Sequence, residues 1–194
     1  MINNNQNYDH HGFDRRTADQ MVDGLADLVR QRVDAGFEPS LLSLMFARLP
    51  GSPTAVVGQM RDEVTRVFST FITRVERNPT RFAAPLPILV AAPDTPVRKR
   101  HRQAVHDVAL NGGAHVHAVL LVPPASRLRM TAEEHFRLNQ ELYLGDRSRI
   151  VRLDVRPVTH SPERVLDYVL KSVRRGRFAL DDVLILPRAV SELR

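Results

Sequence analysis

Cysteine is absent from the 194 residues of the sequence. Its absence excludes disulfide bonds, thiolate metal sites and a cysteine nucleophile. Any metal ion would therefore be bound by histidine together with carboxylate or amide oxygens. Long apolar runs are missing as well: no stretch approaches the ~20 residues needed to cross a bilayer, and the N-terminal residues lack the apolar segment of a signal peptide. We therefore expect a cytoplasmic protein with no membrane partner.

Lysine is also scarce, and Lys99 and Lys171 are the only two, so arginine carries nearly all of the positive charge. The formal net charge is +6 and the isoelectric point is near 10.6. A basic chain favours an anionic partner, because cationic side chains that bind phosphates release condensed counterions. The charge indicates the kind of partner and leaves its identity open.

The composition is that of one soluble globular domain, with 43% hydrophobic and 26% charged residues. Residues 1–15 are polar and rich in asparagine, so we expect a disordered arm there and a single domain over residues 16–194. Hydrophobic periodicity and capping signals predict helices at 17–36, 53–77, 131–144 and 161–176, and strands at 40–49, 86–94, 114–122 and 149–158. This order favours an α+β fold with a small, mainly antiparallel sheet flanked by helices.

Three segments give a less definite signal. The prolines of the strand expected at 86–94 favour an edge strand or positions at the strand ends. Residues 95–111 are basic and could form a short helix, and the C-terminal tail holds one short apolar run of undecided type.

Two histidines open the strand expected at 114–122, within the segment GGAHVHAVLLVPP. Residues i and i+2 of a strand point to the same face, so His115 and His117 present their imidazoles side by side. The rest of the strand is apolar on both faces, so both faces are expected to be buried, and each ring then needs a polar partner. The rings could bind one divalent cation together, or hydrogen-bond to loop backbone and bind nothing.

The same H-x-H pattern occurs in cupins, amidohydrolases and zinc enzymes. The chain is short for an amidohydrolase barrel and lacks the many short strands and glycine-rich turns of a cupin. The histidine pair therefore needs a second feature to indicate a function.

The helix expected at 161–176 has clear boundary signals, with Ser161 as its N-cap, Pro162 at the first helical position and Gly176 at its end. Its apolar stripe consists of Val165, Leu166, Val169, Leu170 and Val173.

Tyr168 lies outside that stripe on a helical projection, beside Arg164, Lys171 and Ser172. A phenol has a pKa of about 10 and becomes a useful nucleophile only where nearby positive charge favours the phenolate. Lys171 and Arg164 lie one turn away on either side and could supply that charge or bind a phosphate. This part of the helix is suited to an anion.

Together these two motifs resemble those of the HUH endonuclease superfamily, which comprises rolling-circle replication initiators, relaxases and single-tyrosine transposases. The resemblance rests on His115-Val116-His117 in a strand and on Tyr168-Val169-Leu170-Lys171 in a helix about fifty residues later. It covers roughly residues 40–176. Ser172 stands where a two-tyrosine enzyme would have its second tyrosine, so the single-tyrosine pattern applies.

The resemblance implies a mainly antiparallel HUH nuclease-like sheet and metal-assisted nicking and joining of single-stranded DNA. His115 and His117 would bind Mg²⁺ or Mn²⁺, Tyr168 would form a covalent 5′-phosphotyrosine, and Lys171 would position the phosphate or stabilise the phenolate.

The third metal ligand of the family is often an acidic residue on a neighbouring strand. Asp94 could take this place if the strands at 86–94 and 114–122 pair, and His106 and Asp107 are its rivals.

Basic clusters flank the two motifs and could follow a DNA backbone. Together with Arg164, the residues expected to bind DNA are Arg98, Lys99, Arg100, Arg174, Arg175 and Arg177. The chain contains no G-x-x-x-x-G-K-[ST] motif, so unwinding would require a separate helicase.

The leading hypothesis is a nicking and joining enzyme of a plasmid, phage or other mobile element. Two alternatives stay open: a non-catalytic DNA-binding relative of the same fold, and a metal-dependent phosphodiesterase that forms no covalent intermediate.

Overall fold

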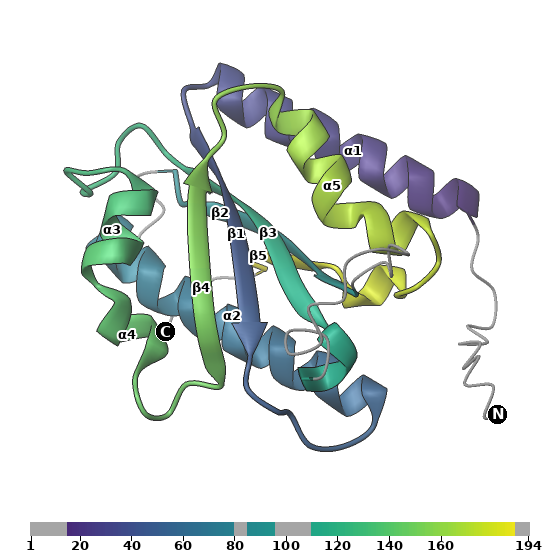
Figure 1. Cartoon of the computed structure of the whole chain (residues 1–194). Helices are drawn as coiled ribbons and strands as arrows, with labels where there is room; N and C mark the ends of the chain where they lie inside the picture. The colour runs from purple at the N-terminus through teal and green to yellow at the C-terminus, as the bar shows by residue number, and fades with distance from the viewer. Residues whose placement is uncertain (1–14, 80–84, 96–109, 189–194) are drawn as a thin grey trace, which may run out of the picture.

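The computed structural model describes residues 15–79, 85–95 and 110–188 (Figure 1). The helices of these residues are α1 (Arg15–Asp34), α2 (Pro53–Val75), α3 (Ala132–Leu138), α4 (Gln140–Leu144) and α5 (Pro162–Arg174). The strands are β1 (Glu38–Phe46), β2 (Ile88–Asp94), β3 (His115–Val122), β4 (Ile150–Pro157) and β5 (Leu184–Leu186). Two short 3-10 turns, η1 (Leu110–Gly113) and η2 (Leu180–Asp182), precede β3 and β5.

The strands form one five-stranded sheet in the order β4-β1-β3-β2-β5. Every neighbouring pair is antiparallel, so the expected α+β fold with a small antiparallel sheet is confirmed. The histidine strand β3 lies at the centre, between β1 and β2. A central strand has all its backbone groups paired, which gives its side chains fixed positions.

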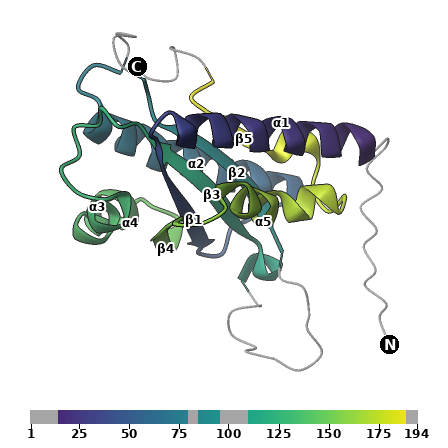
Figure 2. The same ribbon diagram turned by 90° about the horizontal axis from the view of Figure 1, so that it is seen from above.

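The sheet is covered on both faces, and β3 contributes alternate residues to each. Val116, Ala118 and Leu120 pack in the cluster that includes α2, α3 and α4. Val119 and Leu121 pack in the cluster that includes α1 and α5, and Figure 2 shows these two helices side by side. The expected burial of β3 on both faces is therefore confirmed, and the histidines lie on the α1 and α5 side.

The helix expected at 131–144 is wrong as a single element. Thr131 and Glu134 form a capping box at the start of α3, as a helix start requires. At Asn139 the backbone leaves the helical region, with φ −118° and ψ 32°, and α4 begins at the next residue. Both the backbone N–H and the side-chain amide of Asn139 donate to the carbonyl of His135, at 3.0 and 2.9 Å. Asparagine competes with helix continuation in this way.

The expectation that Ser161 caps the N-terminus of α5 through its side chain is also wrong. Ser161 adopts a left-handed conformation, with φ 47° and ψ 62°, and its side chain makes no capping hydrogen bond. Pro162 still begins α5 as expected, because its fixed φ and missing N–H suit the first helical position.

The prolines of β2 were expected to place it at the sheet edge or to lie at its ends. β2 is an interior strand, so only the second expectation is correct. β5 pairs with Leu89, Val90 and Ala91, and Pro93 lies beyond this stretch, where its missing N–H interrupts no bond to β5. The undecided run in the tail forms β5. Most of the expected N-terminal arm and most of the possible helix at 95–111 lie outside the described residues.

A buried histidine predicts how stability depends on pH. His135 Nε2 lies 2.8 Å from the hydroxyl of Tyr143, and both residues are buried. Burial lowers the pKa of His135 below 6.5, and the charge of Arg74 adds to this effect. The unfolded chain therefore binds this proton more readily, and the free energy of unfolding falls as the pH drops below about 6.5, by up to ~1.4 kcal/mol per unit.

Urea unfolding at pH 7.5, 6.5 and 5.5 measures this dependence. His135→Gln removes the titrating group, so its deficit relative to the unsubstituted protein should shrink as the pH falls. Tyr143→Phe is the matched control: it removes the hydrogen bond but keeps the buried imidazole, so its free energy of unfolding should still fall as the pH drops. A constant deficit for His135→Gln would refute the assignment.

Candidate metal and tyrosine site

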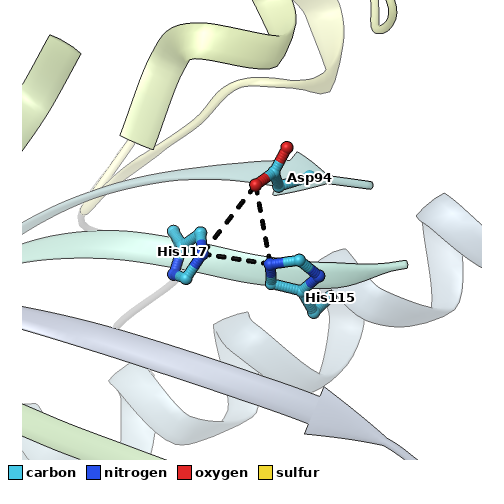
Figure 3. Close-up of side chains that lie close together, drawn as sticks. All are labelled: Asp94, His115 and His117. Atoms are coloured by element: carbon cyan, nitrogen blue, oxygen red, sulfur yellow. Dashed lines mark hydrogen bonds and ion pairs between the residues drawn. The ribbon is translucent and has the colours of Figure 1, made fainter. Parts of the chain in front are cut away.

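The imidazoles of His115 and His117 meet at the start of β3. Their Nε2 atoms lie 3.0 Å apart and the rings are perpendicular, with centroids 4.6 Å apart. His117 is buried and His115 is half-buried. Figure 3 shows both rings turned toward the end of β2.

Asp94 completes the group from β2. The antiparallel register places Asp94 opposite His115, as expected if the two strands pair. Asp94 Oδ2 lies 3.5 Å from His115 Nε2 and 3.9 Å from His117 Nε2 (Figure 3). These residues form the Asp-His-His group, in which one carboxylate oxygen and two ring nitrogens face a common point.

The outer nitrogen of each ring has its own partner. His115 Nδ1 lies 3.0 Å from the carbonyl of Gly113, which can only accept, so Nδ1 carries the proton and Nε2 presents its lone pair to the group. His117 Nδ1 lies 2.9 Å from Ser43 Oγ, a hydroxyl that donates or accepts and so accommodates either tautomer. Such outer hydrogen bonds orient the histidine ligands of metal sites.

The pKa of His117 favours the neutral ring. Burial lowers it to about 4, and the neighbouring His115 pushes it in the same direction. A neutral imidazole is the form that coordinates a metal ion. Near neutral pH the ring needs no deprotonation before binding.

Asp94 is a buried carboxylate held by three donors. Lys171 Nζ lies 2.6 Å from Oδ2, while Oδ1 accepts from the backbone N–H of Thr95 at 2.9 Å and from the hydroxyl of Ser172. Burial raises the pKa of Asp94, but the hydrogen bonds from Lys171 and Ser172 outweigh it and hold the pKa below its usual range. Asp94 is therefore ionised at neutral pH.

Tyr168 reaches the same point from α5. Its hydroxyl lies 3.0 Å from His117 Nε2, and Lys171 Nζ lies 3.9 Å from the centre of its ring. The apolar residues of α5 pack against the sheet, whereas Tyr168 keeps 43% of its surface exposed. Tyr168 is thus open to solvent, unlike the apolar residues of its helix.

The distances fit a single divalent ion. Two ligands about 2.1 Å from one ion are about 3.0 Å apart at a right angle and about 3.4 Å apart at a tetrahedral angle. Two of the three spacings, 3.0 and 3.5 Å, meet these values, and the third, 3.9 Å, needs a shift of a few tenths of an ångström. The Asp-His-His group can bind a metal ion, and its chemistry alone does not select one.

The basic residues expected to bind DNA have different surroundings. Arg164 and Arg175 are exposed, and Arg177 is half-buried. Arg174 forms ion pairs at 3.3 Å with Asp19 and Asp23 of α1, which join the two helices, and one at 3.0 Å with Asp167 of its own helix. Five residues lie outside the described part of the chain: Arg98, Lys99, Arg100, His106 and Asp107.

Sequence reasoning missed two residues of this site, Ser43 and Ser172. From the sequence Ser172 is a neighbour of Tyr168 on the helix and stands at the position of a second tyrosine, with no role of its own, yet it is fully buried and bound to Asp94. Ser172 follows Tyr168 by four residues, a spacing that places both residues on one side of the helix and could have suggested that both face the Asp-His-His group. Ser43 has no comparable signal, because its role follows from the pairing of β1 with β3.

Comparisons of the chain with protein-family models, with curated proteins and with solved structures find no match. Among the described helices, none has the length and apolar character needed to cross a membrane.

Divalent ions are predicted to stabilise the protein through the Asp-His-His group. At an Mn²⁺ concentration 100 times the dissociation constant, binding adds about 2.7 kcal/mol, which raises the unfolding temperature of a chain of this size by about 5 to 10 °C. Thermal unfolding with and without a chelator measures the shift. His115→Gln/His117→Gln should abolish it, and His160→Gln, an exposed histidine, should not. Equal shifts in all three proteins would exclude this site.

Lys171 is predicted to neutralise Asp94. Lys171→Met leaves a carboxylate that is 2% exposed without its counter-ion, which costs about 3 kcal/mol in urea unfolding with chelator present. Lys171→Arg keeps the charge and should be less destabilised. In Lys171→Met/Asp94→Asn the uncompensated charge is gone, so the combined destabilisation should be smaller than the sum of the two single effects. Additive effects would show that the two side chains are not coupled.

Proposed function

We propose that the protein nicks and rejoins single-stranded DNA through a covalent 5′-phosphotyrosine at Tyr168, in the manner of the HUH endonucleases that it resembles. The observation that carries the proposal is the contact between the Tyr168 hydroxyl and His117 Nε2, 3.0 Å long, across 51 residues of chain. A nucleophile beside a metal-binding group and a lysine is an arrangement suited to phosphoryl transfer.

His115, His117 and Asp94 would hold the ion, which we take to be Mg²⁺ or Mn²⁺. When bound, a divalent ion supplies positive charge to the scissile phosphate and to the departing oxygen. The carboxylate suits both ions, and the two imidazoles favour Mn²⁺ of the pair.

Tyr168 supplies the nucleophile. Its oxygen forms a bond to phosphorus while the bond from phosphorus to the 3′ oxygen breaks. The phenol proton passes to the solvent that reaches this half-exposed side chain, and the departing 3′ oxygen takes up a proton to become a hydroxyl. One phosphate ester replaces another, so the reverse attack by a 3′ hydroxyl rejoins the strand.

Lys171 supplies positive charge to the exchange of phosphate esters. Its ammonium group lies between the Asp94 carboxylate and the Tyr168 ring, and its side chain is only 25% exposed. Positive charge at this place stabilises the negative charge that develops on the phenol oxygen and on the phosphate. Asp94 in turn keeps the ammonium in place.

The biological setting follows from the reaction proposed. A reversible nick with a protein-bound 5′ end serves replication initiation or mobilisation of a plasmid, phage or other mobile element. Since the sequence has no P-loop motif, a separate helicase would unwind the DNA.

Incubation with a pool of labelled single-stranded oligonucleotides and Mn²⁺ tests the proposal. A labelled protein adduct should appear on a denaturing gel, and it should be absent in Tyr168→Phe and when the chelator is added. Tyr8→Phe makes the same chemical change elsewhere in the chain and should leave the adduct intact.

The remaining outcomes separate the alternatives. Metal-dependent cleavage with no adduct would support a phosphodiesterase. Binding without cleavage, unaffected by chelator and by Tyr168→Phe, would support a non-catalytic DNA-binding protein. Either result would overturn the proposed nicking activity.

A further inference from the structure

The sheet face that carries the histidines extends sideways beyond the site. Residues directly opposite each other in antiparallel strands point to the same side. His115 is opposite Met45 of β1, and Met45 is opposite Arg152 of β4. In the same way Leu41 is opposite Arg156. Two arginines of the outer strand therefore share the face of the Asp-His-His group.

Helices α1 and α5 pack on β2 and β3, while β4 packs with α3 and α4 on the opposite side of the sheet. The burial of β4 follows this arrangement. Val155 is buried toward α3 and α4, whereas Arg152 and Arg156 are exposed. Figure 1 shows β4 as the outer strand, next to β1. The alternation of apolar and polar residues in RIVRLDVRPV is typical of a strand with one solvent-exposed face, and the position of that face beside the site comes from the pairing with β1.

We propose that this β1–β4 face, formed by Leu41, Ser43, Met45, Arg152, Asp154 and Arg156, binds the single-stranded DNA next to the bond that Tyr168 cleaves. The inference rests on the proposed function and extends it to the path of the substrate. Arg152 and Arg156 would contact phosphates, and no residue of this face was among those expected from the sequence to bind DNA.

The dimensions suit a strand that starts at the tyrosine. β4 is two strands away from β3, about 10 Å at the usual strand spacing, and four residues of a strand span about 13 Å. A polynucleotide with its scissile phosphate at Tyr168 thus meets both arginines within a few nucleotides.

The chemistry of the face favours an unpaired strand. Met45 lies between His115 and Arg152, and Leu41 lies between Val119 and Arg156. Both are half-buried and offer apolar contact to bases. The face has no aromatic side chain, so base stacking on rings, which supports tight binding to single strands, is missing here. Binding is therefore mainly to the phosphates, tolerant of sequence and sensitive to salt.

The negative charge of Asp154 opposes DNA binding at this face, which provides a second variant for the test. It pairs with Arg156 at 3.0 Å, and both side chains are exposed. Exposed ion pairs contribute little to stability, so a phosphate can displace Asp154 from Arg156. Removing the Asp154 charge should strengthen DNA binding without loss of fold.

Fluorescence anisotropy with a labelled 20-nucleotide single strand, in chelator and over a series of salt concentrations, tests the proposal. Arg152→Gln/Arg156→Gln should bind about tenfold more weakly, and the slope of log affinity against log salt should fall by about 1.4, or ~0.7 for each phosphate that is no longer neutralised. Asp154→Asn should bind more tightly. Arg129→Gln/Arg137→Gln is the control, since it removes the same charge from exposed positions in and beside α3, on the other side of the sheet.

Equal weakening by both double variants would mean that only net charge matters, and would overturn the β1–β4 face. So would tighter binding of single-stranded RNA or of duplex DNA than of single-stranded DNA. An adduct at Tyr168 together with unchanged binding by Arg152→Gln/Arg156→Gln refutes this inference and leaves the proposed function standing. Weaker binding by Arg152→Gln/Arg156→Gln alone supports the β1–β4 face as the DNA-binding surface. If no adduct forms at Tyr168 in addition, the DNA-binding face is supported and the proposed nicking activity is refuted.

Discussion

The site depends on one buried carboxylate. Asp94 at the end of β2 accepts from Lys171 and Ser172 of α5 and lies within 4 Å of both histidines of β3. A charge at this depth is tolerated only with such partners, because an unpaired buried carboxylate is costly. The same contacts that satisfy Asp94 attach α5 to the sheet. This attachment sets the height and rotation of the helix, and with them the position of the Tyr168 hydroxyl.

Each side chain of the Asp-His-His group is held by a neighbour that has no role of its own in the proposed chemistry. Ser43 and the carbonyl of Gly113 orient the two imidazoles, and Ser172 orients the carboxylate. Such support matters because a metal ion demands its ligands within a few tenths of an ångström. Tyr168 differs from these three residues, since 43% of its surface is exposed to solvent.

The antiparallel order of the sheet also decides where the open surface lies. β3 is central and β4 is an outer strand, with β1 between them. Helices α1 and α5 cover the β2 and β3 side of the histidine face, and this leaves β1 and β4 as its more open part. The exposed Arg152 and Arg156 of this open part share the sheet face of the histidines, whereas Arg174, which was expected from the sequence to bind DNA, forms ion pairs within the protein.

Local periodicity determined much of this molecule. The spacing of two residues put His115 and His117 on one face, and the helical spacing kept Tyr168 out of the apolar stripe, since both relations depend only on backbone geometry. Errors arose where a side chain competed with the backbone, as at Asn139, or where a residue suited to a helix cap made no capping hydrogen bond, as at Ser161. Tertiary structure alone decided that Asp94 faces His115, that Ser43 and Ser172 support the site and that the arginines of β4 share its face. These contacts join residues far apart in the chain, and strand register and helix packing, which set them, result from burying the whole core at once.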